Sequence, residues 1–168
     1  MRRFALGAAA LVGAALSLNS AASTFLRLDI PDLVRGSDRG VYAGRVESLR
    51  STWNPERTMI WTEAVVHSSE DLTGGNGAGQ SLLFRVPGGV VDGYRVEMAG
   101  APLFEIGDEI VVFATSWPDG SLMVHGYFQG ISSIRLGPQG EEVLAGGSAD
   151  GMKLAELRRS VRAMREGR

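Results

Sequence analysis

A series of short β-forming segments, each ended by a glycine or proline turn signal, is the feature that most constrains this chain. β-Branched and aromatic residues are concentrated at 58–67, and a further strand-like run at 80–86 stops at the Pro-Gly-Gly of 87–89. Apolar and charged residues alternate at 94–98, which is the period of a half-buried strand. Short strands separated by turn signals predict a mainly β domain over 41–136.

Five to six antiparallel strands of this kind leave two open sheet edges unless the sheet closes on itself. Closure removes those edges, so we predict a small OB-like β-barrel, with an open β-sandwich as the alternative. Gly44, Gly126 and Gly130 lie inside strand-like stretches, where glycine is typical of the bulges and bends at barrel corners. The chain has no cysteine, so the fold depends on its core and its sheet rather than on disulfides.

The C-terminal segment 150–168 has a helical period instead. Leu154, Leu157, Val161 and Met164 recur at spacings of three and four residues, which places them on one face of an α-helix. Most of the other positions are basic or polar. We interpret this amphipathic helix as packed on the barrel, and contact with an anionic membrane surface or an acidic partner is the alternative.

The N-terminus has the three-part pattern of a secretory signal peptide. Two arginines at 2–3 precede an uncharged apolar run at 4–18, and small residues follow. We expect cleavage near Ala22–Ser23 and an extracytoplasmic protein, periplasmic or secreted. The apolar run is short for a spanning helix of about 20 residues, so a permanent anchor is the less favoured interpretation. Membrane contact is then transient and occurs only through the signal peptide.

These changes of pattern divide the chain into five parts. They are a signal peptide at 1–22, an N-terminal extension at 23–40, the β-barrel domain at 41–136, a linker at 137–149 and the C-terminal helix at 150–168.

Several glycine-containing motifs occur in a fixed order within the β-barrel domain. The most specific is the G-x-P-x-F-x-x-G-D run at 100–108, and a G-x-x-Q-G run follows at 126–130. Gly-Arg-Val at 44–46, Ile-Trp-Thr at 60–62 and Gly-Gly at 88–89 precede them. In this order the motifs resemble a recurrent group of exported bacterial proteins with a single small β domain. The resemblance implies one exported β domain over about 41–136, and it supplies no activity and no catalytic residue.

Patterns of catalytic residues are weak in this sequence. Only His67 and His125 could serve as a histidine base, and there is no G-x-S-x-G motif. The chain lacks cysteine and an H-E-x-x-H pattern, so it has no zinc motif. The glycine-rich run at 74–79 lacks the Lys-Ser/Thr end of a phosphate-binding loop, and adjacent acids such as Asp108-Glu109 are typical of solvated turns. We predict that the protein is not an enzyme and has no catalytic residue, metal site or cofactor.

The tryptophans are the strongest indication of a binding surface. Trp53, Trp61 and Trp117 are the candidate ligand-binding residues, because OB-type barrels bind ligands on one sheet face and exposed rings stack on flat ligands. The competing interpretation is that these rings fill the barrel core. Trp53 and Trp117 lie next to turn signals, so we expect these two rings to be the exposed pair.

The net charge of the chain argues against nucleic acid as the partner. The 17 basic and 19 acidic residues give a net charge of −2, and an acidic chain is a poor match for nucleic acid. We predict an exported, non-enzymatic β-barrel module that binds a protein or glycan partner in the cell envelope or outside. The alternatives are an extracytoplasmic hydrolase or hydrolase accessory protein, and a structural envelope protein. The sequence defines no oligomeric state.

Overall fold

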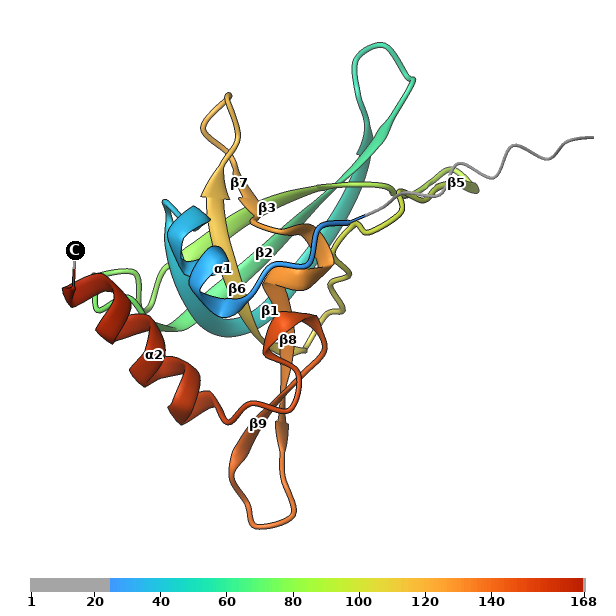
Figure 1. Ribbon diagram of the computed structural model, residues 1–168. Helices are drawn as coiled ribbons and strands as arrows, with labels where there is room; N and C mark the ends of the chain where they lie inside the picture. The colour runs from blue at the N-terminus through green and yellow to red at the C-terminus, as the bar shows by residue number, and fades with distance from the viewer. Residues whose placement is uncertain (1–24, 168) are drawn as a thin grey trace, which may run out of the picture.

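A closed barrel of five strands is the framework of the structure (Figure 1), a computed structural model that describes residues 25–167. Its strands are β1 (Gly40–Trp53), β2 (Ile60–Asp71), β3 (Ser81–Pro87), β6 (Glu109–Ser116) and β7 (Leu122–Val124). They follow the order β1-β2-β3-β7-β6, and β6 pairs with β1 to close the ring. The expectation of a mainly β barrel is confirmed, and the open sandwich is not. The expected signal peptide and its cleavage site lie outside the described residues.

One pair of barrel strands departs from the antiparallel arrangement that we expected. β3 and β7 run parallel, with Phe84 opposite Leu122, while the other barrel neighbours are antiparallel. Strand direction can alternate all the way around a closed ring only if the number of strands is even. A barrel of five strands must therefore contain a parallel pair, and the barrel is mixed.

Two smaller sheet extensions complete the β structure. β8 (Ile131–Leu136) pairs with β6, and β9 (Glu142–Ala145) pairs with β8. β4 (Gly89–Val91) and β5 (Tyr94–Val96) form a separate two-stranded hairpin. Its turn residues Asp92 and Gly93 both have positive φ, as a type I′ turn requires. The alternating residues at 94–98 therefore belong largely to an exposed hairpin and not to a half-buried strand of the main sheet.

Helical segments lie at both ends of the described chain. α1 (Ile30–Gly36) begins with a capping box between Asp29 and Asp32 and lies in the N-terminal extension, where we had expected no helix. The 3₁₀ turns η1 (Tyr127–Gly130) and η2 (Gly147–Ala149) follow β7 and β9. α2 (Leu154–Glu166) is the expected C-terminal helix. Within residues 25–167, no helix combines the length and apolarity needed to cross a membrane.

The apolar run of β6 faces two different cores. Ile110, Val112 and Ala114 point into the barrel, where they join buried side chains of β1, β2 and β3. Val111 and Phe113 point outward into a second buried cluster. Residues 110–114 of β6 are therefore buried on both faces of the sheet, which explains why this part of the strand is continuously apolar.

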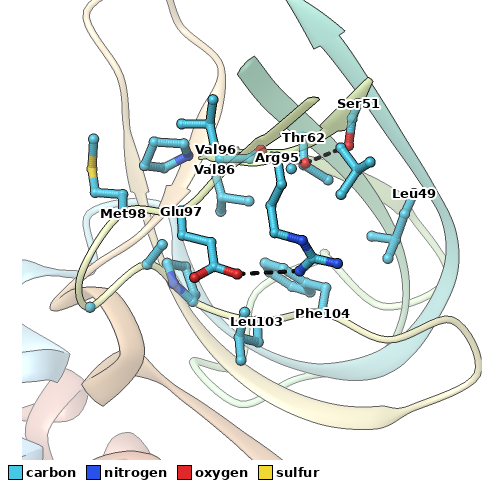
Figure 2. Close-up of a pocket in the computed structure, with 17 residues that line it drawn as sticks. Leu49, Ser51, Thr62, Val86, Arg95, Val96, Glu97, Met98, Leu103 and Phe104 are labelled. Atoms are coloured by element: carbon cyan, nitrogen blue, oxygen red, sulfur yellow. Dashed lines mark hydrogen bonds and ion pairs between the residues drawn. The ribbon is translucent and has the colours of Figure 1, made fainter. Parts of the chain in front are cut away.

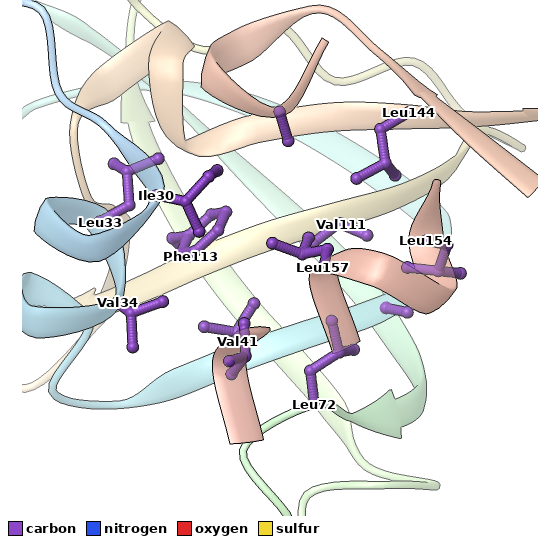
Figure 3. Close-up of a cluster of buried hydrophobic side chains, with 13 residues drawn as sticks. Ile30, Leu33, Val34, Val41, Leu72, Val111, Phe113, Leu144, Leu154 and Leu157 are labelled. Atoms are coloured by element: carbon purple, nitrogen blue, oxygen red, sulfur yellow. The ribbon is translucent and has the colours of Figure 1, made fainter. Parts of the chain in front are cut away.

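The second cluster lies between the barrel and the two helices (Figure 3). α1 contributes Leu33 and Val34, and α2 contributes Leu157 among others, all fully buried. The Arg158 side chain of α2 also donates two hydrogen bonds of 2.7 Å to the carboxylate of Glu70 on β2. Apolar contact and this forked ion pair together hold α2 against the sheet.

Gly44 shows why one of the predicted corner glycines is needed. It lies at a shift in the register between β1 and β2. A Cβ atom at this position would lie 2.4 Å from the carbonyl oxygen of His67 and 2.9 Å from the Cα of Ser68. The absence of a side chain therefore lets β1 and β2 approach closely at a bulge, as the sequence predicted for this position.

Candidate functional site

The three candidate tryptophans lie outside both buried apolar clusters of the described chain, and each is half-buried. Trp61 and Trp117 lie together, with ring centroids 6.0 Å apart and planes inclined by 74°. Trp53 lies in another cluster, 5.9 Å from the ring of Tyr94 and 5.8 Å from the guanidinium of Arg57. The structure therefore brings Trp61 and Trp117 together and places Trp53 apart, and Trp53 and Trp117, which we expected to be exposed, are half-buried like Trp61.

Strand alternation and a tight turn position this pair. On β2, Ala64 and Val66 point into the barrel, so Trp61 points to the outer face, opposite Pro87 of β3. Trp117 directly follows β6 in the turn that leads to β7. Its backbone N–H donates to the Ser121 carbonyl at 2.8 Å, which closes the turn.

Arg85 connects the two tryptophans to the turn. Its guanidinium carbon lies 4.9 Å from the centroid of the Trp61 ring, and its Nη1 lies 3.3 Å from Oδ2 of Asp119. The other oxygen of Asp119 accepts hydrogen bonds from the hydroxyl and the backbone N–H of Ser121, at 2.6 and 3.0 Å. These bonds, the hydroxyl bond above all, lower the pKa of Asp119. The carboxylate therefore stays ionised at neutral pH and orients Arg85.

We call Trp61, Arg85 and Trp117 the tryptophan corner. An apolar hollow of about 170 Å³ opens beside it, and Arg85 is the only charged residue among those that line it. A shallower hollow of about 240 Å³ continues from the corner over Pro118 and Asp119. The remaining lining of the apolar hollow comes from Val86, Pro87, Met98, Pro102, Met123, Val124 and Tyr127.

A larger groove lies at the mouth of the barrel (Figure 2). It has a volume of about 600 Å³ and is bounded by the inner side of the barrel, the β4–β5 hairpin and the segment 97–104. Phe104 lines it and packs against Phe84 of the barrel core, with ring centroids 6.0 Å apart. The groove and the hollow at the tryptophan corner share Val86, Pro87, Met98 and Pro102.

Few polar groups line the barrel-mouth groove. The hydroxyls of Ser51 and Thr62 are 2.8 Å apart, and Thr62 donates to the carbonyl of Gly88 at 2.7 Å. Figure 2 shows the side chains of Arg95 and Glu97 reaching toward each other beside Leu103 and Phe104. Their charged atoms are 3.3 Å apart.

The two histidines occupy different surroundings. His67 is exposed on the outer face of β2, opposite Ser81. His125 is half-buried against Gly36 at the end of α1, and this burial lowers its pKa although the charge of Asp38 acts in the opposite direction. Over residues 25–167, no three or more acidic or histidine side chains gather in a way that could hold a metal ion.

Comparison of the chain with protein-family models, curated proteins and solved structures finds no match. The site must therefore be interpreted from its own geometry.

Two parts of this surface escaped the sequence analysis. Arg85 alternates with Phe84 and Val86, so its outward direction could have been predicted from the period of β3. No local signal in the sequence indicates that the turn at 117–121 reaches β3, or that the β4–β5 hairpin encloses a groove.

Proposed function

We propose that this chain is an exported, non-enzymatic binding module with an OB-like barrel, and that it binds a partner protein through the tryptophan corner. The observation that carries this proposal is the meeting of Trp61 and Trp117 with Arg85 at the edge of an apolar hollow. Tryptophan and arginine are enriched among the residues that contribute most to protein–protein binding, and methionine is enriched at interfaces in general.

The location on the barrel supports the same proposal. A barrel of five strands that is closed by the pairing of β6 with β1 fits the OB type. OB-type barrels bind ligands on the face of their second and third strands and at the loop between their fourth and fifth strands. Trp61 and Arg85 lie on the corresponding outer face of β2 and β3. Trp117 lies in the turn between β6 and β7, the last two barrel strands.

The lining of the hollow favours an apolar side chain of a protein over a glycan. A sugar carries many hydroxyl groups, which need hydrogen-bonding partners when they leave water. Besides one charged group, the Tyr127 hydroxyl and the indole N–H groups of the two tryptophans, the hollow offers only methionine, proline and valine side chains. In addition, the guanidinium of Arg85 already covers part of the Trp61 ring on which a sugar would stack.

Export is part of the proposal, on the basis of the leader pattern and of the resemblance to the exported group. N-terminal sequencing of the protein from its native host tests it. We expect a start near Ser23, and a start at Met1 would contradict export.

Site-specific photo-crosslinking in the native host tests the binding surface. A photoreactive residue replaces Met123, which lines the hollow, and the control places it at Leu136, which is exposed on β8. We expect a protein adduct of defined mass at position 123, none at 136, and loss of the adduct when Trp61→Ala is added. An adduct that forms equally at both positions, or that survives Trp61→Ala, would contradict the proposal.

A glycan partner is the other outcome to be distinguished. Soluble envelope glycan fragments are titrated against the purified protein while tryptophan fluorescence is followed. We expect no saturable change. A saturable change that Trp117→Ala abolishes and Trp53→Ala retains would replace the protein partner with a glycan.

A further inference from the structure

The barrel-mouth groove adjoins the hollow at the tryptophan corner and shares four lining residues with it, but it is larger and is also lined by a carboxylate, Glu97. We infer that it binds a single-chain amphiphile with a zwitterionic head, the apolar chain lying in the groove and the head at Arg95 and Glu97. Its volume of about 600 Å³ lies within the range of about 300–1,000 Å³ that is typical of small-molecule sites. Such sites have mostly apolar walls and a few polar groups that fix the orientation of the ligand, as this groove does.

The base of the groove suits a hydrocarbon chain. Leu49, Val86 and Phe104 supply apolar side chains there. Thr62 has one hydroxyl proton, which it donates to the Gly88 carbonyl, so Ser51 must be the donor in the bond between the two hydroxyls. Both protons are thus already used within the protein, and an apolar chain can cover these groups without breaking a hydrogen bond.

The rim of the groove suits a head that carries both charges. The side chains of Arg95 and Glu97 are 69% and 77% exposed, so a head bound there remains in water. A head with only a negative charge is attracted by Arg95 but repelled by the neighbouring carboxylate of Glu97. A head with only a positive charge is attracted by Glu97 but repelled by Arg95. A head with a phosphate and an ammonium group can place each charge next to its opposite.

Exposed apolar side chains around the groove favour the entry of a hydrocarbon chain. Val90, Met98 and Leu103 line the groove and are all exposed to water in the described structure. An amphiphile that covers them removes apolar surface from water on both partners, which favours binding.

Dodecylphosphocholine, used below the concentration at which it forms micelles, is the probe. Titration calorimetry of the whole mature protein should show saturable binding of one dodecylphosphocholine molecule per protein chain. Amide NMR shifts should be confined to the residues that line the groove on β1, β2, β3, the β4–β5 hairpin and the segment 97–104. Dodecanoate and dodecyltrimethylammonium share the chain length, and we expect each to bind about fivefold more weakly, the effect of one exposed ion pair. Equal binding of all three would overturn the assignment of the head group.

Blocking the groove tests the location. Ala101→Trp introduces a large side chain into the lining, and Ala155→Trp makes the same change on the exposed side of α2. We expect Ala101→Trp to weaken binding by more than about tenfold and Ala155→Trp to leave it unchanged. Arg95→Glu should reverse the preference in favour of the cationic probe. Unaltered binding by the Ala101→Trp protein, or binding only above the micelle-forming concentration, would overturn the site. These measurements do not depend on the outcome of the crosslinking experiment.

Discussion

The two sides of the barrel use apolar residues in opposite ways. On the side covered by α1 and α2, Leu33 and Leu157 are fully buried (Figure 3). On the side of the β4–β5 hairpin and the segment 97–106, Leu103 is 83% exposed and Ile106 is 65% exposed. Side chains of similar hydrophobicity are thus removed from water on one side and left in water on the other.

The difference follows from the structure of the covering segments. An amphipathic helix presents one continuous apolar stripe, so α2 can bury Leu154, Leu157 and Val161 together against the sheet. The segment 97–106 crosses the barrel mouth without a regular helix or strand, and it buries Pro102 but leaves Leu103 and Ile106 exposed. We conclude that the helix-covered side buries its apolar side chains and stabilises the fold, while the hairpin side leaves apolar side chains exposed to water.

The largest effect should come from removing a leucine on each side. Leu157→Ala should lower the free energy of unfolding by about 2–5 kcal/mol, because it leaves a cavity beneath α2. Leu103→Ala, the matched change on the hairpin side, should alter it by less than about 0.5 kcal/mol. Urea unfolding of both variants measures the difference. Equal losses would break the comparison, because Leu103 would then be structural.

A smaller loss should result from filling the close approach of β1 and β2. Gly44→Ala forces a Cβ atom against the backbone at His67, and such overpacking costs about 1–3 kcal/mol. Ser48→Ala, at an exposed position of the same strand, is the control. The midpoints of thermal unfolding of the two variants measure the difference in stability. A Gly44→Ala protein as stable as the control would show that the bulge can relax.

The ion pairs on the two sides should differ by a smaller amount. Glu70→Gln weakens the forked contact with Arg158. This contact is partly buried, and its hydrogen bond is the main cause of the raised pKa of Arg158. We expect a loss of about 1 kcal/mol that shrinks as salt is added. Glu97→Gln, which removes the exposed pair with Arg95, should cost close to nothing. Chemical unfolding at low and high salt tests both variants.

The smallest effect should be a dependence of stability on pH at His125. Burial lowers its folded-state pKa below the ordinary value of 6.5, so the unfolded chain takes up the proton first as the pH falls. Stability should therefore be complete above about pH 6.5 and decline below it, until the pH passes the folded-state pKa. His125→Gln should flatten this slope and His67→Gln, at an exposed histidine, should not. An unchanged slope in His125→Gln would assign the effect to other groups.

The parts of the fold that could be predicted are those with a strong local signal. The apolar spacing of Leu154, Leu157 and Val161 needs no distant partner to indicate a helical face. The alternation at 94–98 misled the analysis, because a two-residue period is the same in a core strand and in an exposed hairpin. α1 was missed although Asp29 and Asp32 offered a capping signal.

The sequence by itself indicated a mainly β domain, the C-terminal helix and the set of tryptophans that could form a surface. Only the tertiary structure decided that Trp61 meets Trp117 and Arg85, and that Trp53 lies apart with Tyr94. The physical reason is the range of the interactions. Local conformation depends on neighbouring residues, whereas strand order and closure depend on apolar burial summed over the whole chain. The parallel pairing of β3 with β7, which places the turn at 117–121 beside β3, is a product of that closure.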